Sequence, residues 1–186
     1  MIETKKITTP LTNDVIANLK SGDKVEISGI LYTARDAAHK RLVKMIKDGE
    51  KLPFDITGQI IYFVGPTPAK PGTPIGSAGP TTSGRMDIYS PFLIERGLKA
   101  MIGKGARSKD VIDAMIKSKC IYFAAIGGVA ALLSKKIVKA EIIAFDDLGT
   151  EAIRKLEVKD FPVVVINDIY GGDLYKEGVK HYLTLV

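Results

Sequence analysis

The sequence predicts one mixed α/β domain, in which strands and helices are interspersed along the whole chain. Three observations predict it. The first is the length, because 186 residues correspond to a single domain over residues 1–186. The second is the composition, since 46% hydrophobic and 26% charged residues are typical of a globular protein with a buried core. The third is that short apolar runs alternate with segments of helical periodicity.

The N-terminal part of the chain predicts a strand, a helix and a second strand. Residues Lys24–Ser28 alternate polar and apolar side chains, as a half-buried strand does, and Leu31–Thr33 extends this strand after Gly29. Apolar side chains recur on one face of the segment Asp36–Lys47, which predicts a helix. The apolar run Ile60–Val64 predicts a buried strand.

A loop rich in proline and glycine follows, over residues 65–87. Five of the nine prolines lie between Gly65 and Pro80. A long loop of this composition within a globular domain is either disordered or functional. Proline stiffens the backbone, and glycine permits tight turns and the close approach of a ligand. We therefore favour a shaped, functional loop over a disordered one.

Two longer helices, one short helix, three buried strands and a final edge strand are predicted in the C-terminal half. The first helix opens at Ser90-Pro91, with Ser90 as the N-cap, and runs to about Met101. Ser108 caps the second helix. Gly127-Gly128 leads from the first of the strands into a short helix of small residues. The predicted strands are Cys120–Ile126, Ile142–Phe145, Phe161–Ile166 and, at the edge, His181–Val186.

The charge balance restricts the partners that we expect. The 27 Lys and Arg residues against 21 Asp and Glu residues give a net charge of +6, which favours either nucleic acid or small anionic substrates. The basic residues are scattered, so a nucleic-acid-binding tail is not expected. The N-terminal segment lacks the apolar core of a signal peptide, and no segment reaches the ~20 apolar residues of a membrane span. We therefore expect a cytoplasmic protein that contacts neither nucleic acid nor a membrane.

The cysteine and histidine content argues against a metal site within this chain. A single cysteine, Cys120, cannot form an internal disulfide or supply the several thiolates of an iron–sulfur cluster. Its apolar neighbours predict an inert, buried thiol. The two histidines, His39 and His181, are far apart in the sequence, so no zinc site is expected. His39 follows Arg35 by four residues on one helix face, where it is either a hydrogen-bonded helix residue or part of a site.

Three cationic residues on predicted turns are candidates for binding an anion. Arg35 begins a helix that follows a strand, where free N–H groups and the helix dipole favour negative charge. Arg85 ends the Pro/Gly-rich loop, and Lys104 lies between Gly103 and Gly105. The segment does not fit a Walker phosphate loop, because Gly97 and Gly103 enclose five residues and a glycine follows the lysine. Because a guanidinium fork matches a carboxylate, these residues could grip a dicarboxylate. The structural alternatives are ion pairs of the two arginines with Asp36 and Asp87, and a solvated turn lysine at 104.

Several segments together resemble class I fumarate hydratases and tartrate dehydratases. They are Thr33–His39 (TARDAAH), Gly65–Thr67 (GPT), Gly79–Asp87 (GPTTSGRMD) and Gly103–Gly105 (GKG), in the order in which that family has them. GPTTSGRMD is the most specific of these segments, and the resemblance covers nearly the whole chain. It implies the swivelling β/β/α fold of the fumarase C-terminal domain, which two-subunit members carry as a separate beta subunit.

The resemblance also implies roles for individual residues. Arg35, Arg85 and Lys104 match residues that hold the substrate carboxylates. Thr81 matches the proposed base at the carbon that loses its proton, with Thr82 as the alternative. The residues expected near the site are Asp36, His39, Thr82 and Asp87.

A partner and a cofactor are implied as well. A larger alpha subunit would supply the cysteine ligands of a [4Fe–4S] cluster, which acts as a Lewis acid on the substrate, and this chain would bind no part of it. The expected activity is the interconversion of fumarate and L-malate by a heterotetramer of the two kinds of subunit. The alternatives are the beta subunit of a tartrate dehydratase and a non-catalytic basic binding module.

Overall fold

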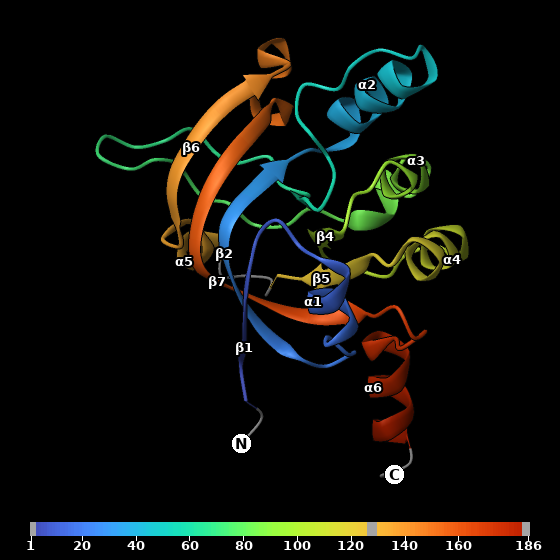
Figure 1. Cartoon of the computed structure of the whole chain (residues 1–186). Coiled ribbons are helices and arrows are strands. Elements are labelled where there is room, and N and C mark those ends of the chain that lie inside the picture. The colour runs from blue at the N-terminus through green and yellow to red at the C-terminus, as the bar shows by residue number, and fades with distance from the viewer. Residues whose placement is uncertain (1–2, 126–129, 184–186) are drawn as a thin grey trace.

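Seven strands form one sheet in the computed structural model, which describes residues 3–125 and 130–183 (Figure 1). The strands are β1 (Lys5–Thr8), β2 (Lys24–Thr33), β3 (Ile60–Tyr62), β4 (Ala100–Gly103), β5 (Ile121–Ala124), β6 (Ile137–Ala144) and β7 (Ile153–Asn167). The helices are α1 (Asn13–Ala17), α2 (Asp36–Lys47), α3 (Ser90–Glu95), α4 (Lys109–Ser118), α5 (Ala130–Ser134) and α6 (Leu174–Leu183), with 3-10 segments η1 (Ser83–Met86) and η2 (Asp146–Glu151). No helix in these described ranges is long and apolar enough to cross a membrane.

Five of the strands close into a small barrel. β2, β3, β4 and β5 are parallel neighbours. The long strand β7 runs antiparallel to β5 at one end of this row and to β2 at the other, which closes the ring. β1 pairs with β2 and β6 pairs with β7, and both lie outside the ring. Figure 1 shows the bend of β2, β6 and β7 that accompanies this closure.

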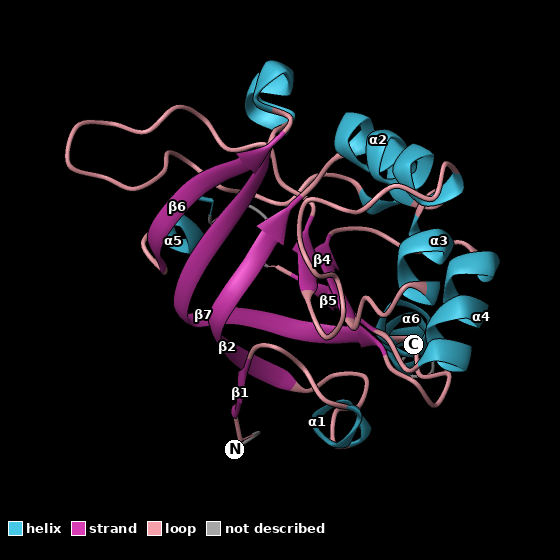
Figure 2. Ribbon diagram, turned by 45° about the horizontal axis from the view of Figure 1, so that its top comes forward, coloured by secondary structure: helices cyan, strands magenta, loops and turns pink. Residues whose placement is uncertain are grey.

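Successive side chains of the central strands point to opposite faces of the sheet, so the core has two layers. Ile60 and Tyr62 of β3 belong to the layer inside the barrel, whereas Ile61 and Phe63 belong to the layer beneath the helices. The outer layer is covered by α2, α3 and α4, which lie on one side of the sheet (Figure 2). All four side chains are fully buried. Burial on both faces explains why the run Ile60–Val64 is continuously apolar.

The predicted mixed α/β class is confirmed, and several elements have the expected positions. The two strand segments on either side of Gly29 form the single strand β2, with an irregularity in its pairing at this glycine, whose φ is 114°. The helix α2 has the predicted bounds of 36–47. Ser108 occupies the N-cap position of α4, and β5 falls within the strand predicted at Cys120–Ile126. Gly127-Gly128 lies outside the described residues.

The prediction of one helix from Ser90 to about Met101 is wrong. α3 ends at Glu95, and Gly97, with a φ of 99°, turns the chain into β4. All four residues of β4 are buried between β3 and β5. The N-cap of α3 is Tyr89 and not Ser90. Packing as a central strand therefore overrides the local helical pattern.

The two ends of the chain also differ from the prediction. The edge strand predicted at His181–Val186 is wrong for its first three residues, which belong to α6, and its last three lie outside the described residues. The hydrophobic pattern of the sequence did not predict β1 and α1. β6 and β7 start earlier than predicted, because charged side chains on their exposed faces interrupt the apolar runs.

Candidate functional site

The predicted site segments meet beyond the carboxyl ends of three neighbouring parallel strands. Arg35 follows the end of β2 by two residues, and Lys104 directly follows the end of β4. Between them, the N–H of Thr81 donates to the carbonyl of Phe63, just past β3, at 2.7 Å. This edge of a parallel sheet is where α/β proteins commonly bind ligands. The fold therefore brings together segments that lie 69 residues apart in sequence, from Arg35 to Lys104.

Arg85 is held against the start of α2 by Asp36. Its Nε donates to Oδ2 of Asp36 at 2.8 Å, and its Nη2 forms an ion pair with the same oxygen. The Arg85 side chain is still half exposed, at 51%. Nη1 makes no hydrogen bond within the described residues, so the guanidinium keeps a donor for another anion.

Arg35 has a different carboxylate partner, Glu151 of η2. Nη2 of Arg35 lies 3.4 Å from Oε1 of Glu151, and the other oxygen of Glu151 accepts from the N–H of Ala37 at 3.0 Å. Glu151 thus caps α2, so an internal carboxylate already occupies the anion position expected at this helix start. Nε of Arg35 is buried without a partner in the described structure. A side chain on Gly65 would lie 2.8 Å from Nη1 of Arg35, which explains the glycine there.

Lys104 lies on an exposed turn that is paired with the GPTTSGRMD segment. It forms a parallel bridge with Thr82. The N–H of Ser83 donates to the Lys104 carbonyl at 2.9 Å, and the N–H of Lys104 donates to the Ser83 hydroxyl at 3.0 Å. Its ammonium forms no ion pair with a described residue. Thr81 is half-buried at this edge, whereas Thr82 is exposed.

Asp87 holds Arg107, a residue that the sequence reasoning missed. Nε of Arg107 donates to Oδ1 of Asp87 at 2.7 Å, and Oδ2 accepts from the N–H of Ser108 at 2.6 Å. The Arg107 guanidinium is fully buried and lies 5.2 Å from the ring centre of Phe63 and 5.0 Å from that of Tyr122. A lone arginine before a helix gives no sequence signal of burial. Neither Arg35 nor Arg85 therefore pairs with Asp87. Asp87 instead holds the buried Arg107 side chain and the backbone at Ser108 in place.

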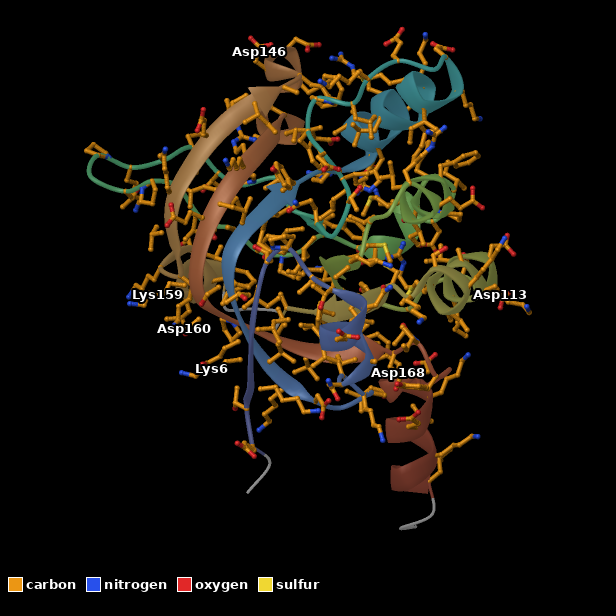
Figure 3. The ribbon with its side chains drawn as sticks, viewed as in Figure 1. Lys6, Asp113, Asp146, Lys159, Asp160 and Asp168 are labelled. Atoms are coloured by element: carbon orange, nitrogen blue, oxygen red, sulfur yellow. The ribbon has the colours of Figure 1, made fainter. Side chains whose placement is uncertain are left out.

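We expect Asp87→Asn to destabilise the protein by about 1.5–3 kcal/mol, because it removes the charge from the hydrogen bonds that satisfy a buried guanidinium. Urea unfolding at neutral pH measures the effect. The matched control is Asp113→Asn, since Asp113 forms an exposed ion pair with Lys109 on the outer side of α4 (Figure 3). The control should change stability by less than about 0.5 kcal/mol. Equal effects of the two variants would contradict the anchoring role of Asp87.

His39 is a buried, hydrogen-bonded residue of α2. Its Nδ1 donates to the carbonyl of Arg35 at 2.9 Å, and its Nε2 is buried with no partner in the described structure. Burial is the main cause that lowers the pKa of His39 to about 4; the hydrogen bond to the Arg35 carbonyl partly opposes it, the nearby Arg107 charge adds to it, and Asp36 opposes it least. His39 is therefore a neutral imidazole at pH 7, and the lone pair of its Nε2 has no hydrogen-bond partner in the described structure.

This burial predicts an acid-sensitive fold. The ordinary pKa of histidine is 6.5, so the unfolded chain takes up the proton before the folded protein does as the pH falls. The contribution of the neutral His39 to the free energy of unfolding is fully present above pH 6.5. It falls by about 3 kcal/mol in all as the pH is lowered from 6.5 to 4. His39→Asn retains a donor for the Arg35 carbonyl but does not titrate. Urea unfolding between these two pH values should show a shallower pH dependence in the variant, and identical slopes would contradict this prediction.

Cys120 does not fit a role in metal binding. It is fully buried, and burial raises the pKa of its thiol to about 12, so it is protonated at neutral pH. The described residues contain no group of three or more His, Cys, Asp or Glu side chains arranged to hold a metal ion. An iron–sulfur cluster therefore has no set of ligands in the described part of this chain.

The family model described as "Fumarase C-terminus" matches residues 2–178. The chain belongs to this fumarase C-terminal family. The predicted resemblance is thereby confirmed, and the mixed α/β structure with its small barrel is the fold of the fumarase C-terminal swivelling domain.

Relatives in the fumarase C-terminal family are of two lengths. A protein of Methanocaldococcus jannaschii named "Putative L(+)-tartrate dehydratase subunit beta" is 40% identical over 173 residues, which cover 90% of this chain and 89% of that protein. The anaerobic class I fumarate hydratase of Escherichia coli K12 is 40% identical over 159 residues, which cover 84% of this chain but 29% of the enzyme. Fumarate hydratase 2 of Leishmania major is 42% identical, over 28% of its length. The chain thus spans under a third of these fumarate hydratases and nearly all of the subunit.

Proposed function

We propose that this chain is the beta subunit of a [4Fe–4S]-dependent hydro-lyase that interconverts fumarate and L-malate in the cytoplasm. The gathering of three cationic segments at the carboxyl ends of β2, β3 and β4 carries the proposal, together with membership of the fumarase C-terminal family. In this proposal Arg35, Arg85 and Lys104 bind the two carboxylates of the substrate. Thr81 takes the proton from the substrate carbon.

The donors that are still free make these residues suitable for a dicarboxylate. Nη1 of Arg85 and the ammonium of Lys104 have no acceptor among the described residues, whereas Nε of Arg35 also lacks one but is buried, so it would meet a substrate only after that side chain moves. Asp36 and Glu151 hold the two guanidiniums in place before a substrate arrives. Because long charged side chains lose conformational freedom on binding, this preorganisation lowers the entropic cost of gripping a diacid. Charge-assisted hydrogen bonds then fix the orientation of the substrate.

Thr81 is a chemically demanding base. A hydroxyl accepts a carbon-bound proton only if its alkoxide is stabilised, and neighbouring cations stabilise negative charge in a site with little water. Thr81 is half-buried next to the segment that pairs with Lys104, whereas the exposed Thr82 has more contact with water. The chain therefore supports Thr81 as the base more than Thr82.

The proposal requires a partner chain. Cys120 is buried and protonated, so the cluster of the assembled enzyme would be held by an alpha subunit. That cluster would supply a Lewis acid, and the residues of this chain would bind and orient the substrate and move its proton. We propose a heterotetramer of the two kinds of subunit. Glu151 and Arg107 position the substrate-binding arginines and their loop, and do not themselves contact the substrate.

A tartrate dehydratase is the second candidate. The M. jannaschii protein, whose name refers to L(+)-tartrate, is matched over 89% of its own length. L-malate and tartrate differ by one hydroxyl group. The walls that discriminate between them would come partly from the alpha subunit.

Reconstitution tests both candidates. We expect no turnover by this chain alone, and turnover of L-malate and fumarate once the cluster-bearing chain is added without oxygen. For fumarase activity, kcat/KM for L-malate should exceed that for L(+)-tartrate by at least about 10-fold. The reverse order would assign the chain to a tartrate dehydratase. Absence of turnover of all these diacids, in an assembly with an intact cluster, would contradict a hydro-lyase.

A further inference from the structure

A chain of hydrogen bonds joins the Lys104 turn to the GPTTSGRMD segment through the interior of the protein. The N–H of Lys104 lies 3.0 Å from the Ser83 hydroxyl, which lies 2.8 Å from the hydroxyl of Tyr122 in β5. The Tyr122 hydroxyl in turn lies 2.9 Å from the carbonyl of Gly105. This series of hydrogen bonds thus starts at the N–H of Lys104 and ends on the same turn, at the carbonyl of Gly105. Ser83 and Tyr122 are both fully buried.

The groups at the two ends of this hydrogen-bond series, an N–H and a carbonyl, fix which atom donates in each bond. An amide N–H can only donate and a carbonyl can only accept, so Lys104 donates to Ser83 and Tyr122 donates to Gly105. The single hydrogen of Tyr122 is then used, and the Ser83 hydroxyl must donate to Tyr122. Burial raises the pKa of Tyr122 well above its usual value, so this hydrogen stays in place at all physiological pH values. The arrangement satisfies each buried hydroxyl as both donor and acceptor.

Tight packing leaves Ser83 little freedom to move. A side chain on Gly103 would lie 2.0 Å from the Ser83 hydroxyl oxygen and 2.9 Å from the ring of Phe63, so the Ser83 side chain fills the space that the glycine leaves. The Tyr122 ring is held by the buried Arg107 guanidinium at 5.0 Å. The same Arg107 is anchored by Asp87 at the end of the GPTTSGRMD segment.

We propose that Ser83 and Tyr122 are positioning residues that lock the Lys104 turn onto the Thr81–Ser83 segment. This Ser83–Tyr122 clamp rests on the proposed function, because it fixes the distance between the proposed carboxylate-binding ammonium and the proposed base. Neither residue touches the substrate. Both act through the backbone of residues that do.

Removal of the Tyr122 hydroxyl tests the clamp in the assembled enzyme. We expect Tyr122→Phe to lower kcat by about 10- to 100-fold, because sub-ångström misplacement of the base slows the chemical step. KM should change less than kcat, since Arg35 and Arg85 keep their own anchors, Glu151 and Asp36. The matched control is Tyr170→Phe, which removes a 2.8 Å hydrogen bond from a tyrosine hydroxyl to the Ala17 carbonyl outside the site. A kcat of Tyr122→Phe within twofold of wild type, or equal to that of Tyr170→Phe, would overturn the proposal.

The second variant is Ser83→Ala, alone and combined with Tyr122→Phe. If the two hydroxyls act as one chain, the double variant loses about as much kcat as the more damaging single variant. Multiplication of the two single losses would contradict a common clamp. This comparison holds even if each variant loses some stability, because the thermal midpoint of each can be measured separately.

Amide hydrogen exchange of the full chain separates the clamp from the proposed function. The Lys104 amide should exchange at least about tenfold faster in Ser83→Ala, which removes its acceptor, while amides of β3 keep their wild-type rates. An unchanged Lys104 rate would overturn the clamp whatever the assembled enzyme does. A wild-type assembly that turns over no diacid would count against the hydro-lyase proposal alone, and the exchange result would then decide the clamp.

Discussion

Replacement of Arg85 by alanine should lower kcat/KM of the assembled enzyme by about 10³-fold, a loss of about 4 kcal/mol in transition-state stabilisation. Two effects combine. The substrate loses a guanidinium that is half exposed and retains a free Nη1 donor. In addition, Oδ2 of Asp36 loses the partner that neutralises it, so that a bare carboxylate faces an incoming dianion.

The effect of the unpaired Asp36 carboxylate can be tested separately. In the double variant Arg85→Ala/Asp36→Ala, the unpaired carboxylate is gone, and part of the lost activity should return. Arg85→Lys, which keeps the charge but not the fork, should fall between wild type and Arg85→Ala. Arg96→Ala serves as the control, because it removes an exposed arginine at the end of α3, outside the site. Wild-type activity of Arg85→Ala would remove this residue from the site.

Thr81→Val should lower kcat by about 10²–10⁴-fold, the usual contribution of a positioned general base. Valine has nearly the shape of threonine and leaves the backbone bond from Thr81 to Phe63 intact, so KM should stay close to that of wild type. Thr81→Ser restores the hydroxyl and should recover much of the rate. Initial rates over a range of L-malate concentrations, in the reconstituted assembly, separate kcat from KM.

The neighbouring threonine provides the comparison for this result. Thr82 is exposed and pairs through its backbone with Lys104, so Thr82→Val should have a much smaller effect on kcat than Thr81→Val. A reversal of the two effects would make Thr82 the base. Wild-type kcat in both variants would contradict a threonine base altogether.

The elements that depend on local pattern could be predicted from the sequence. α2 has an apolar face and a clear end, and its predicted bounds agree with the structure. β4 could not be found in this way, because Ala100–Gly103 is too short to show a period and follows a helix after one glycine turn. Closure of the barrel by β7 is a pairing between residues about 130 apart, for which the local pattern carries no signal.

The residues of the candidate site also fall into those that could be predicted from the sequence and those that could not. Arg35, Arg85 and Lys104 lie in segments that can be recognised together, and the parallel strands place those segments at one edge. Their supports come from elsewhere in the chain. Glu151 caps α2 from a position 114 residues after Ala37, and Tyr122 reaches the Lys104 turn from a buried strand. Such contacts depend on the tertiary fold, and neither residue belongs to a motif.

We propose that Arg35, Arg85 and Lys104 together form one half of a pocket for a small diacid. A crystal structure of the assembled enzyme with bound L-malate tests it most directly. We expect nitrogen atoms of all three side chains to lie within hydrogen-bond distance of the two carboxylates. A diacid held by the alpha subunit alone, with these three side chains turned to solvent, would contradict it.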